Sequence, residues 1–442
     1  MNTVFIVLDT VRKDRISVYN DEVDFTNNIE NFAEKATVFN DAVAQAPWTL
    51  PSHASMFTGL YPWEHNATQQ QLYLDTEKTL LAEKFRKEGY KTACYTSNTW
   101  ITPYTGMASG FDDVDNFFGV MPNNMMSDKT EKVWRWMNKG KAEWFMNKLI
   151  QIGEKFHWMT AGMNASTKTP AVIDKAENFI EQNRDEDFFL FLNFMDAHLP
   201  YYPPEEYREK HAPDVNPKEI CQEAHNHNGG TDEADFEASR KLYDAEIDFL
   251  DDQLGNLFQY FEDEDLMEET VFVVVADHGE NLGENDMMGH QFSVSEQLVS
   301  VPMMIKAPGL DQKEVDQQVE LRKLYDIVPK ISALESNQPV FEESKALGGY
   351  QRPRMDLKNI PEEKQPDLDK RLSFVRGSGN KLVRSENEEL SEDTMFEIKT
   401  GSEIDIDSEF VSQLDRIGEA DEGSTDIEEE QVKERLEELG YM

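Results

Sequence analysis

Residues 3–8 read Thr3-Val4-Phe5-Ile6-Val7-Leu8, and Asp9 follows them directly. The hydrophobic side chains of this run do not alternate with polar ones, which is typical of a strand buried on both faces of a parallel sheet. Two later runs have the same character and are also followed by acidic and histidine side chains. They are residues 188–194, followed by Asp196 and His198, and residues 271–275, followed by Asp277 and His278.

Between these runs lie segments with the periodicity of amphipathic helices, for example residues 79–87 and 241–261. Alternating strands and helices predict an α/β fold with a large, mainly parallel central sheet and helices on both faces. Ligands of such sheets bind outside the carboxyl ends of the strands. A single aspartate after a strand is most often a turn or helix-capping residue. Three of them at one sheet edge instead predict a functional site.

A second stretch supplies a candidate nucleophile. It reads Gln45-Ala46-Pro47-Trp48-Thr49-Leu50-Pro51-Ser52-His53-Ala54-Ser55-Met56-Phe57-Thr58-Gly59. Pro51 suits the first turn of a helix and Gly59 suits its end, so we expect a helix that begins near Pro51. Its N–H groups and positive dipole end would point at an anion held beside Thr49. An ordinary loop followed by a capped helix is the alternative.

The composition is that of an acidic protein with enough hydrophobic residues for a core. The 442 residues include 43 Lys and Arg against 87 Asp and Glu, a formal charge of −44, and 39% of them are hydrophobic. Nucleic acid is excluded as an expected partner, because phosphate binding needs a basic surface. We expect a globular, acid-coated protein of a salt-rich, halophilic cytoplasm rather than an acidic interaction protein.

Cysteine usage and hydropathy bear on the compartment. Cys94 and Cys221 are too few for a disulfide framework and indicate a reducing environment. The N-terminus reads as a strand and not as a signal peptide. No apolar window is long enough to span a membrane, so we expect a soluble cytoplasmic protein. The sequence leaves the oligomeric state open.

The chain divides by composition into three regions. Residues 1–335 carry the features above and are expected to form the catalytic unit, with the Met-, Trp- and Lys-rich residues 118–170 as a helical insertion. The proline-containing residues 336–368 are expected to form a connecting segment. Residues 369–442 predict a smaller C-terminal α+β subdomain with an acidic tail region. The elements expected there are strands at 371–376, 381–384 and 395–398 and a helix at 428–439.

Several motifs occur in a specific order along the chain. They are Ile6-Val7-Leu8-Asp9-Thr10-Val11-Arg12, Thr49 to Gly59 with Leu60-Tyr61-Pro62 and His65, Gly89-Tyr90, His198-Leu199-Pro200-Tyr201, Tyr243-Asp244 to Leu254-Gly255, Ala276-Asp277-His278-Gly279-Glu280, Gly289-His290 to Glu296, Val301-Pro302, Ala307-Pro308-Gly309 and Leu439-Gly440-Tyr441. Each motif is weak alone, but the ordered set resembles the sulfatase family of the alkaline phosphatase superfamily. That family has a large α/β domain and a smaller C-terminal α+β subdomain, in agreement with the layout above.

The resemblance also implies roles for individual residues. The implied ligands of one divalent metal ion are Asp9, Thr49, Asp277 and His278. The family favours Ca²⁺, and an oxygen-rich set with one imidazole also suits Mg²⁺ or Mn²⁺ and does not exclude Zn²⁺. His198 and His290 occupy positions that in the family contact the anionic oxygens of the ester or its leaving group.

Three positions depart from the family pattern. Sulfatases mature a cysteine or serine nucleophile into formylglycine, whereas this chain has Thr49, whose methyl group blocks oxidation to an aldehyde. His53 stands where the family has arginine, and Asn98 lies in a segment that replaces the family's Lys-Trp-His. The loss of these cations weakens the case for a doubly charged monoester. A threonine nucleophile resembles instead the nucleotide pyrophosphatase/phosphodiesterase branch and the phosphoglycerol and phosphoethanolamine transferases.

These observations favour a metal-dependent hydrolase of phosphodiesters or other phosphate esters that works through a phospho-threonine intermediate. Thr49 would attack phosphorus in line while His53 or Asn98 stabilises the equatorial oxygens. His198 or His290 would protonate the leaving group and then activate the water that cleaves the intermediate.

Alternatives are open at this point. A second metal ion could be held by Asp196, His198 and His290. The chain could also be a sulfuric ester hydrolase that uses unmodified Thr49, an inactive binding protein with the sulfatase fold, or an acidic interaction module. The expected partner of the enzyme is a small-molecule, glycan or lipid anionic ester.

Overall fold

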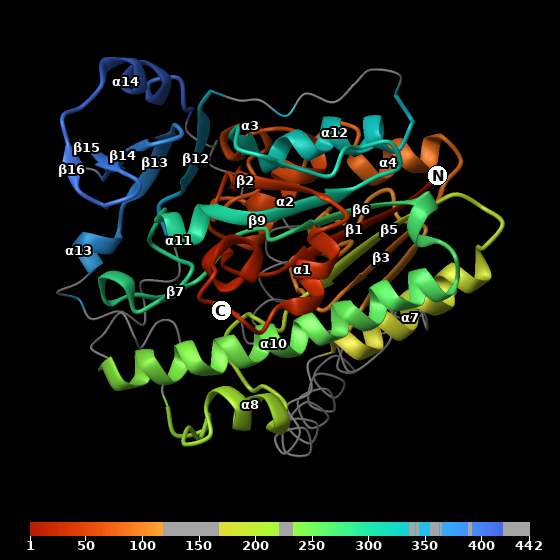
Figure 1. Cartoon of the computed structure of the whole chain (residues 1–442). Coiled ribbons are helices and arrows are strands. Elements are labelled where there is room, and N and C mark those ends of the chain that lie inside the picture. Colours follow the sequence, from red (N-terminus) through yellow and green to blue (C-terminus); the bar gives the residue numbers. More distant parts are fainter. Residues whose placement is uncertain are drawn as a thin grey trace, which may run out of the picture.

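The three hydrophobic runs form neighbouring parallel strands in the middle of one sheet (Figure 1). They are β1 (Asn2–Leu8), β5 (Phe188–Phe194) and β6 (Thr270–Val275), and β1 lies between the other two. Val7 of β1 pairs in register with Asn193 of β5 and with Val275 of β6. The residues that follow the three strands therefore leave the sheet at one edge, as predicted.

The computed structural model describes residues 1–117, 168–220, 233–335, 341, 344–353, 362, 365–387 and 391–418. Within these residues the central sheet has nine strands in the order β10-β2-β9-β6-β1-β5-β3-β4, with β11 also paired to β2. Among the described strands of the central sheet, β9 is the one that runs antiparallel to both of its neighbours. The bounds of the other strands are β2 Thr37–Val43, β3 Lys91–Thr96, β4 Asp113–Asn116, β9 Ser300–Lys306, β10 Lys313–Val315 and β11 Val319–Glu320.

Helices cover both faces of the central sheet (Figure 1). Successive residues of β5 point to opposite faces, because Phe188 packs on Phe179 whereas Phe189 stacks on Phe85, with ring centroids 5.9 and 4.3 Å apart. The Phe179 side carries α1 (Asn27–Ala33), α7 (Thr169–Gln182), α8 (Glu205–His211) and α10 (Glu233–Asp263). The Phe85 side carries α2 (Thr49–Thr58), α3 (Pro62–His65), α4 (Leu81–Lys87) and α12 (Leu324–Ile331).

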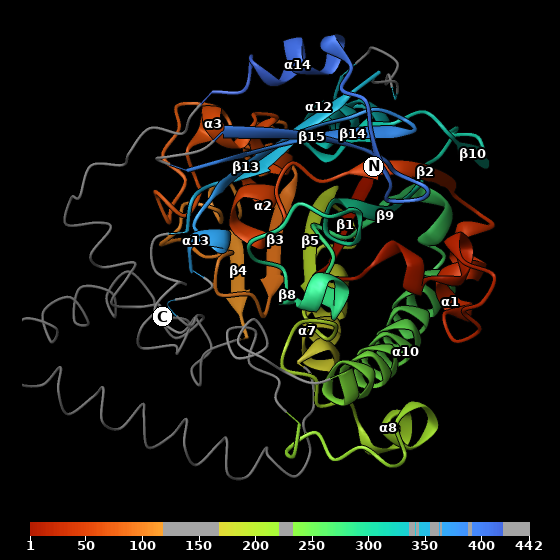
Figure 2. The same ribbon diagram turned by 90° about the vertical axis from the view of Figure 1, so that its left-hand side faces the viewer.

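A separate antiparallel sheet follows, which we name the C-terminal sheet. Its described strands are β12 (Ala346–Tyr350), β13 (Arg371–Arg376), β14 (Asn380–Glu386), β15 (Ser391–Glu397) and β16 (Glu403–Ile404), hydrogen-bonded in that order. Helix α14 (Ser408–Leu414) lies beside this sheet (Figure 2), where Phe410 and Leu414 share a small hydrophobic core with Val375, Leu382 and Met395. The predicted fold class, a large mainly parallel sheet with a smaller α+β subdomain, is confirmed.

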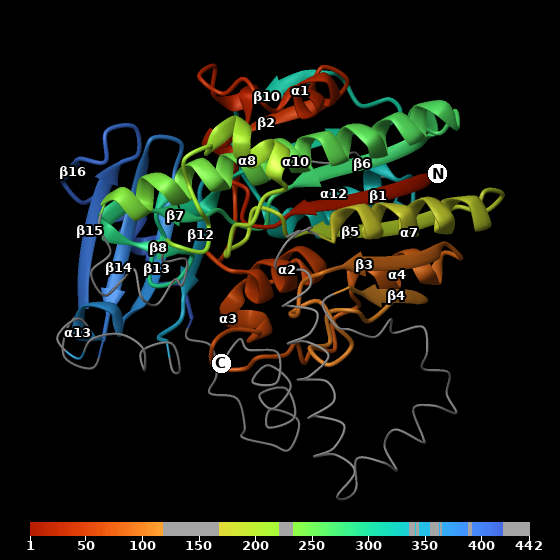
Figure 3. The same ribbon diagram turned by 90° about the horizontal axis from the view of Figure 1, so that it is seen from below.

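The C-terminal sheet lies beyond the carboxyl ends of the central strands (Figure 3). A short hairpin of β7 (Asn281–Leu282) and β8 (Met288–Gly289), followed by α11 (Glu296–Val299), lies between the two sheets. The other short elements are the 3₁₀ turns Lys13–Arg15, Ser17–Tyr19, Met267–Glu269, Glu284–Asp286 and Leu321–Lys323, and α13 (Gln365–Leu368). The edge of the central sheet at which we expected the site is therefore the edge nearest the C-terminal sheet.

Some boundaries differ from expectation. Strand β12 lies inside the expected connecting segment 336–368 and pairs with β13. Helix α10 begins at Glu233 rather than near residue 241, because its buried stripe extends back to Phe236 through a mostly charged segment. Residues 118–167 of the expected insertion and the expected helix 428–439 lie outside the described residues. Within the described residues, no helix has both the length and the apolar character needed to cross a membrane.

His65, the last residue of α3, is buried against α2. The Ala67 backbone N–H donates to His65 Nδ1 at 3.1 Å, so the ring proton lies on Nε2, 3.1 Å from Ser55 Oγ. Burial lowers the pKa of His65 to about 3. A histidine in the unfolded chain titrates at about 6.5.

This difference predicts a loss of stability in acid. Below about pH 6.5 the unfolded chain binds a proton at this position that the native state does not accept until about pH 3, so His65 lowers the free energy of unfolding as pH falls through that window. We expect His65→Asn to make the free energy of unfolding fall less steeply between pH 6 and 4, by about 1.4 kcal/mol per pH unit. The measurement is urea unfolding at several pH values in concentrated KCl. Equal slopes for the two proteins would contradict a neutral native His65.

Candidate active site and metal centre

The candidate nucleophile lies at the start of a buried helix. Thr49 is the first residue of α2, two residues earlier than the sequence suggested, with Trp48 as the extended N-cap residue. The helix ends at Gly59, whose φ of 74° lies in the left-handed region that favours glycine. Thr49 therefore lies at the N-terminal end of α2, where the first N–H groups of a helix have no partner within the helix.

Asp9, Asp277 and His278 meet at the carboxyl edge of the central sheet. Each offers a ligand atom, and these atoms all lie within 4.8 Å of one another. Among the described residues this is the one group of three or more His, Cys, Asp or Glu side chains arranged in this way. All three side chains are buried. These are three of the four residues that the family resemblance implied as metal ligands.

The donor set fits a divalent cation. Asp9 Oδ2 accepts hydrogen bonds from Asn98 at 2.7 Å and Asn193 at 3.2 Å, but Asp9 Oδ1 has no partner among the described residues. Asp277 Oδ1 accepts the His278 backbone N–H at 2.9 Å, whereas Asp277 Oδ2 likewise has no hydrogen-bond partner among them. Burial and the neighbouring Asp9 charge raise the pKa of Asp277 well above its usual value. A bound cation would compensate both carboxylates.

His278 has the protonation state of a ligand. Its Nδ1 lies 2.8 Å from the Gly279 carbonyl oxygen and donates to it, so Nε2 carries the lone pair. Burial, followed by the neighbouring His290, lowers the pKa of His278 well below its usual value. The neutral ring places Nε2 3.5 Å from Thr49 Oγ1. The fourth predicted ligand, Thr49, is therefore next to the group.

Asn98 connects Thr49 to the acidic pair. Its Oδ1 accepts the Trp100 backbone N–H at 2.8 Å, which fixes the orientation of the amide. Its Nδ2 then donates to Asp9 and lies 3.4 Å from Thr49 Oγ1. The indole of Trp100 meets that of Trp48 edge to face, with centroids 5.3 Å apart, so an aromatic pair lies beside the hydroxyl.

His53 is fully buried on α2. Its Nδ1 donates to the Thr49 carbonyl oxygen at 3.0 Å and lies 3.4 Å from Asp277 Oδ2. The ring packs between Phe57 and Phe191, and burial lowers its pKa to about 4. The side chain is therefore a neutral support of Asp277 and Thr49, not a replacement for the positive charge of an arginine.

His198 and His290 lie together beside the metal-binding group. Their ring centroids are 5.2 Å apart, and that of His290 is 4.6 Å from the ring of His278. Nδ1 of His198 donates to the Leu199 carbonyl oxygen at 2.6 Å, and Nδ1 of His290 lies 3.0 Å from Glu280 Oε1. Both rings are thus oriented through Nδ1, which turns Nε2 to the opposite side.

The alternative second metal site is not assembled. Asp196, His198 and His290 do not bring three ligand atoms together among the described residues. Asp196 Oδ2 instead accepts the Thr169 hydroxyl from α7 at 2.5 Å. A residue that follows a strand can be held by a neighbouring helix, and sequence spacing does not reveal which of the two partners it has.

Two residues near the site were missed from the sequence. Asn193 is the last but one residue of β5 and reads as part of a hydrophobic strand, yet it contacts Asp9. A single amide in an otherwise apolar strand was the available signal. Glu280 is a fully buried acid paired with His290, and its position after His278-Gly279 gave no indication of its partner.

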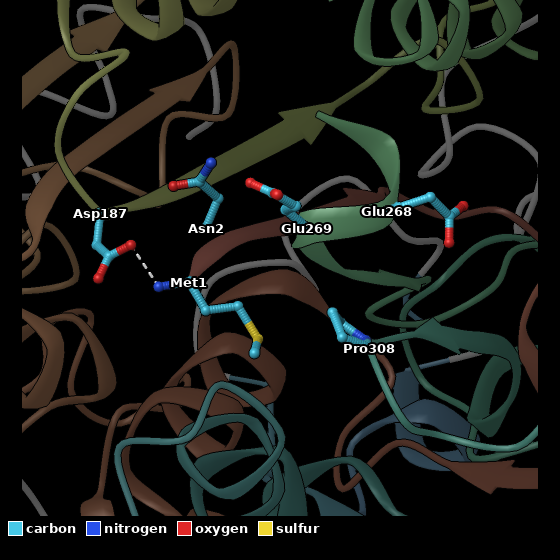
Figure 4. A pocket seen from close by; sticks show the side chains of 6 residues that line it. All are labelled: Met1, Asn2, Asp187, Glu268, Glu269 and Pro308. Atoms are coloured by element: carbon cyan, nitrogen blue, oxygen red, sulfur yellow. Dashed lines mark hydrogen bonds and ion pairs between the residues drawn. The ribbon is translucent and has the colours of Figure 1, made fainter. Parts of the chain in front are cut away.

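A surface pocket of a different kind lies at the opposite edge of the sheet (Figure 4). Its lining residues are Met1, Asn2, Asp187, Glu268, Glu269 and Pro308. The α-amino group of Met1 forms an ion pair with Asp187 (Figure 4). Five of these residues precede or begin β1, β5 and β6, and Pro308 follows the antiparallel strand β9, so the pocket is separate from the site at the carboxyl ends.

The fold and the buried Asp-Asp-His group define a hydrolase of the alkaline phosphatase superfamily. The family model described as Sulfatase matches residues 1–334, and the chain belongs to the sulfatase family. It is 25% identical over 359 residues to "Uncharacterized sulfatase YidJ" of Escherichia coli, covering 75% of this chain and 67% of that protein. It is 26% identical over 364 residues to an ulvan-active sulfatase of Formosa agariphila, covering 76% of this chain and 61% of that protein.

Solved structures confirm the fold. The phosphonate monoester hydrolase of Agrobacterium radiobacter superposes with a TM-score of 0.67 at 16% sequence identity, covering 99% of this chain and 95% of that one. The chain spans only about two thirds of the length of the relatives named above, 67% and 61%. The activity of the whole protein is therefore argued from the site itself.

The metal-binding group makes a prediction that does not depend on turnover. We expect the protein to bind about one equivalent of Ca²⁺ or Mn²⁺, and the bound ion to raise the unfolding temperature because it binds only the native state. Asp277→Asn removes one ligand charge at constant shape and should weaken binding at least tenfold, measured by isothermal titration calorimetry. Asp187→Asn, in the remote pocket, is the matched control. Unaltered binding by Asp277→Asn would contradict this metal centre.

Proposed function

We propose that this sulfatase-family hydrolase cleaves singly charged esters, phosphodiesters first among them, with Thr49 as the nucleophile. The observation that carries the proposal is the position of Thr49 Oγ1, at the first residue of α2 and 3.5 Å from Nε2 of His278 in the Asp-Asp-His group. A hydroxyl held at a helix N-terminus beside a cation site is suited to nucleophilic attack on an anionic ester.

Charge favours a monoanionic substrate. Within the described part of the chain, no lysine or arginine forms a hydrogen bond or ion pair with Asp9, Thr49, Asp277 or His278. A divalent ion would be offset by the two carboxylates, which leaves little positive charge for a doubly charged phosphate monoester. A phosphodiester or a sulfate monoester carries one negative charge and suits this balance better.

In the proposed reaction Thr49 Oγ1 forms a bond to phosphorus as the bond to the leaving alcohol breaks. The proposed metal ligands are Asp9, Thr49, Asp277 and His278, and the ion would supply Lewis-acid stabilisation of the hydroxyl as an alkoxide. The N–H groups of the first turn of α2 and the amide of Asn98 donate to the ester oxygens. The product of this step is a phosphodiester of Thr49, which conserves the charge of the substrate.

His198 and His290 are the proposed proton carriers. One of them donates its Nε2 proton to the leaving oxygen and then accepts a proton from the water that attacks phosphorus. That attack breaks the bond from phosphorus to Thr49 Oγ1 and regenerates the Thr49 alkoxide, which the ion would stabilise. The support for this role is the orientation of both rings through Nδ1, to the Leu199 carbonyl and to Glu280.

Sulfuric ester hydrolysis is the second candidate. The ulvan-active sulfatase of Formosa agariphila gives it weight, as does the single charge of a sulfate ester. Thr49 cannot become an aldehyde, so a sulfated Thr49 would have to be released by attack of water on sulfur. The sulfatases avoid this step through formylglycine, whereas a threonine nucleophile resembles the phosphodiesterase branch, so we place the phosphodiester first. Retention of Asp9, Asp277 and His278 argues against an inactive binding protein.

Several broader features belong to the same proposal. Residues 1–335 form the catalytic unit, and residues 369–442 together with β12 form the subdomain. Ca²⁺ is the favoured ion, with Mn²⁺, Mg²⁺ or Zn²⁺ as alternatives. The organic part of the ester belongs to a small molecule, glycan or lipid. A formal charge of −44 supports a halophilic cytoplasmic setting, in which salt screens self-repulsion.

The test compares kcat/KM for bis-4-nitrophenyl phosphate, 4-nitrophenyl phosphate and 4-nitrophenyl sulfate in concentrated KCl with Ca²⁺ or Mn²⁺. We expect kcat/KM for the diester to exceed that for the other two esters by at least tenfold. Thr49→Ala should lower kcat/KM for the diester by about 10³-fold or more. Thr58→Ala, which removes a hydroxyl at the other end of α2, should change it less than about threefold. A lead for the sulfate ester would replace the first candidate by the second, and no hydrolysis of any ester would refute both.

A further inference from the structure

His290 is carried by a loop and not by a strand. We name residues 290–295, between β8 and α11, the His290 loop. At its start, Asn281 Nδ2 donates to the Gly289 carbonyl oxygen at 2.9 Å, and Glu280 holds His290 Nδ1 at 3.0 Å. These two contacts orient the ring from the active-site side. At the other end of the loop the Ser295 hydroxyl donates to Asn281 Oδ1 at 3.2 Å. The residues between these ends depend on other contacts.

The C-terminal sheet supplies those contacts. The ring of Phe292 packs on that of Tyr350 in β12, with centroids 6.1 Å apart and both side chains buried. Lys381 in β14 donates from Nζ to the carbonyl oxygen of Val294. The same Nζ lies 3.0 Å from Glu296 Oε1, at the first residue of α11. A single buried lysine thus holds the end of the loop and the start of the next helix.

Arg376 in β13 completes the arrangement. Its Nε lies 2.9 Å from Glu296 Oε2 and its NH1 lies 2.6 Å from Asp41 Oδ1 of β2. Burial alone would raise the pKa of Glu296, but the charges of Lys381 and Arg376 outweigh it and hold that pKa below its usual value. Two cations of the C-terminal sheet therefore face two carboxylates of the main domain, and Lys13 of the main domain lies near the same carboxylates.

Helix α11 is in direct contact with the segment that carries His278. The Gly279 N–H, directly after His278, donates to the Leu298 carbonyl oxygen at 2.9 Å. A Cβ atom at Gly279 would lie 1.9 Å from the carbonyl oxygen of Gln297, so the two segments are in close contact. The position of α11 relative to His278 is thus fixed, and the ion pairs of Glu296 set the end of the His290 loop in the same frame.

We infer that Lys381 and Arg376 are positioning residues for His290, so that the C-terminal sheet takes part in catalysis without touching substrate. The inference rests on the proposed function, in which His290 transfers a proton. Loss of Lys381 releases the Val294 carbonyl and one oxygen of Glu296, and loss of Arg376 releases the other oxygen of Glu296. Either change lets the loop move the His290 ring away from the leaving oxygen. The metal-binding group, held on β1 and β6, stays in place.

The test uses Lys381→Met, which keeps the length of the side chain and leaves Glu296 its bond to Arg376. Arg384→Met is the matched control, since Arg384 lies three residues along the same strand and pairs with Asp393 and Asp415 inside the subdomain. With diphenyl phosphate, whose leaving group needs a proton, we expect Lys381→Met to lower kcat about tenfold with KM within about twofold. With bis-4-nitrophenyl phosphate the loss should be less than about threefold.

A double-mutant cycle separates positioning from general destabilisation. In the His290→Ala background, Lys381→Met should change kcat by less than about twofold, because the group it positions is gone. An undiminished tenfold loss in that background would overturn the inference. The same loss in Arg384→Met would also overturn it, since that variant leaves the His290 loop contacts in place.

A second measurement is independent of turnover. In the full chain labelled with ¹⁵N-histidine, the His290 signals are identified by their absence in His290→Ala. We expect the Nδ1 signal to shift in Lys381→Met and not in Arg384→Met, because only the former disturbs the bond to Glu280. If the protein hydrolyses esters and the His290 Nδ1 signal is unchanged in Lys381→Met, the inference is refuted. A shifted signal in a protein that hydrolyses no ester would uphold the positioning and refute the proposed function.

Discussion

The structure of the site depends on two buried carboxylates that lie side by side. Val7 and Val275 are register partners on β1 and β6, and Asp9 and Asp277 each follow two residues later. Neighbouring strands are about 4.8 Å apart, so the sheet itself brings the two negative charges together. Removing each charge from water costs several kcal/mol unless it is compensated. Asn98, Asn193 and backbone N–H groups provide part of that compensation, and a divalent cation would provide the rest.

The arrangement of parallel strands also explains which site residues could be predicted from the sequence. Unbroken hydrophobic runs identify buried parallel strands, and parallel strands deliver their end residues to one edge, so Asp9, Asp196 and Asp277 could be placed at that edge without a structure. The family resemblance then singled out Asp9, Asp277 and His278. The hydrogen-bond partners of the residues at this edge could not be predicted. Asp196 shares the edge but bonds to Thr169, because α7 packs close to it, and Glu280 finds His290 only through the β7–β8 hairpin. Such contacts depend on how helices and hairpins pack on the sheet.

The acidic surface and the site place opposite demands on an anionic substrate. A chain with a formal charge of −44 repels an ester in dilute salt, whereas concentrated salt shortens the range of that repulsion to a few ångströms. The buried site is screened much less, and its local balance of Asp9, Asp277 and a cation is close to neutral. In the proposed function the substrate would meet the surface field only during approach, and the α2 N-terminus and Asn98 would act on it at contact distance.

Different supports for the two halves of the site match their different roles. A cation site needs ligand atoms held within a few tenths of an ångström, and residues at the ends of adjacent strands have that rigidity. A proton carrier must serve the leaving alcohol and then a water, so a loop residue oriented by Glu280 is better suited to it. A loop between β8 and α11 would be poorly defined if it were held at one end only. The buried ion pairs of Glu296 with Lys381 and Arg376 hold the other end, which gives the C-terminal sheet a reason to lie beyond the carboxyl edge of the central strands.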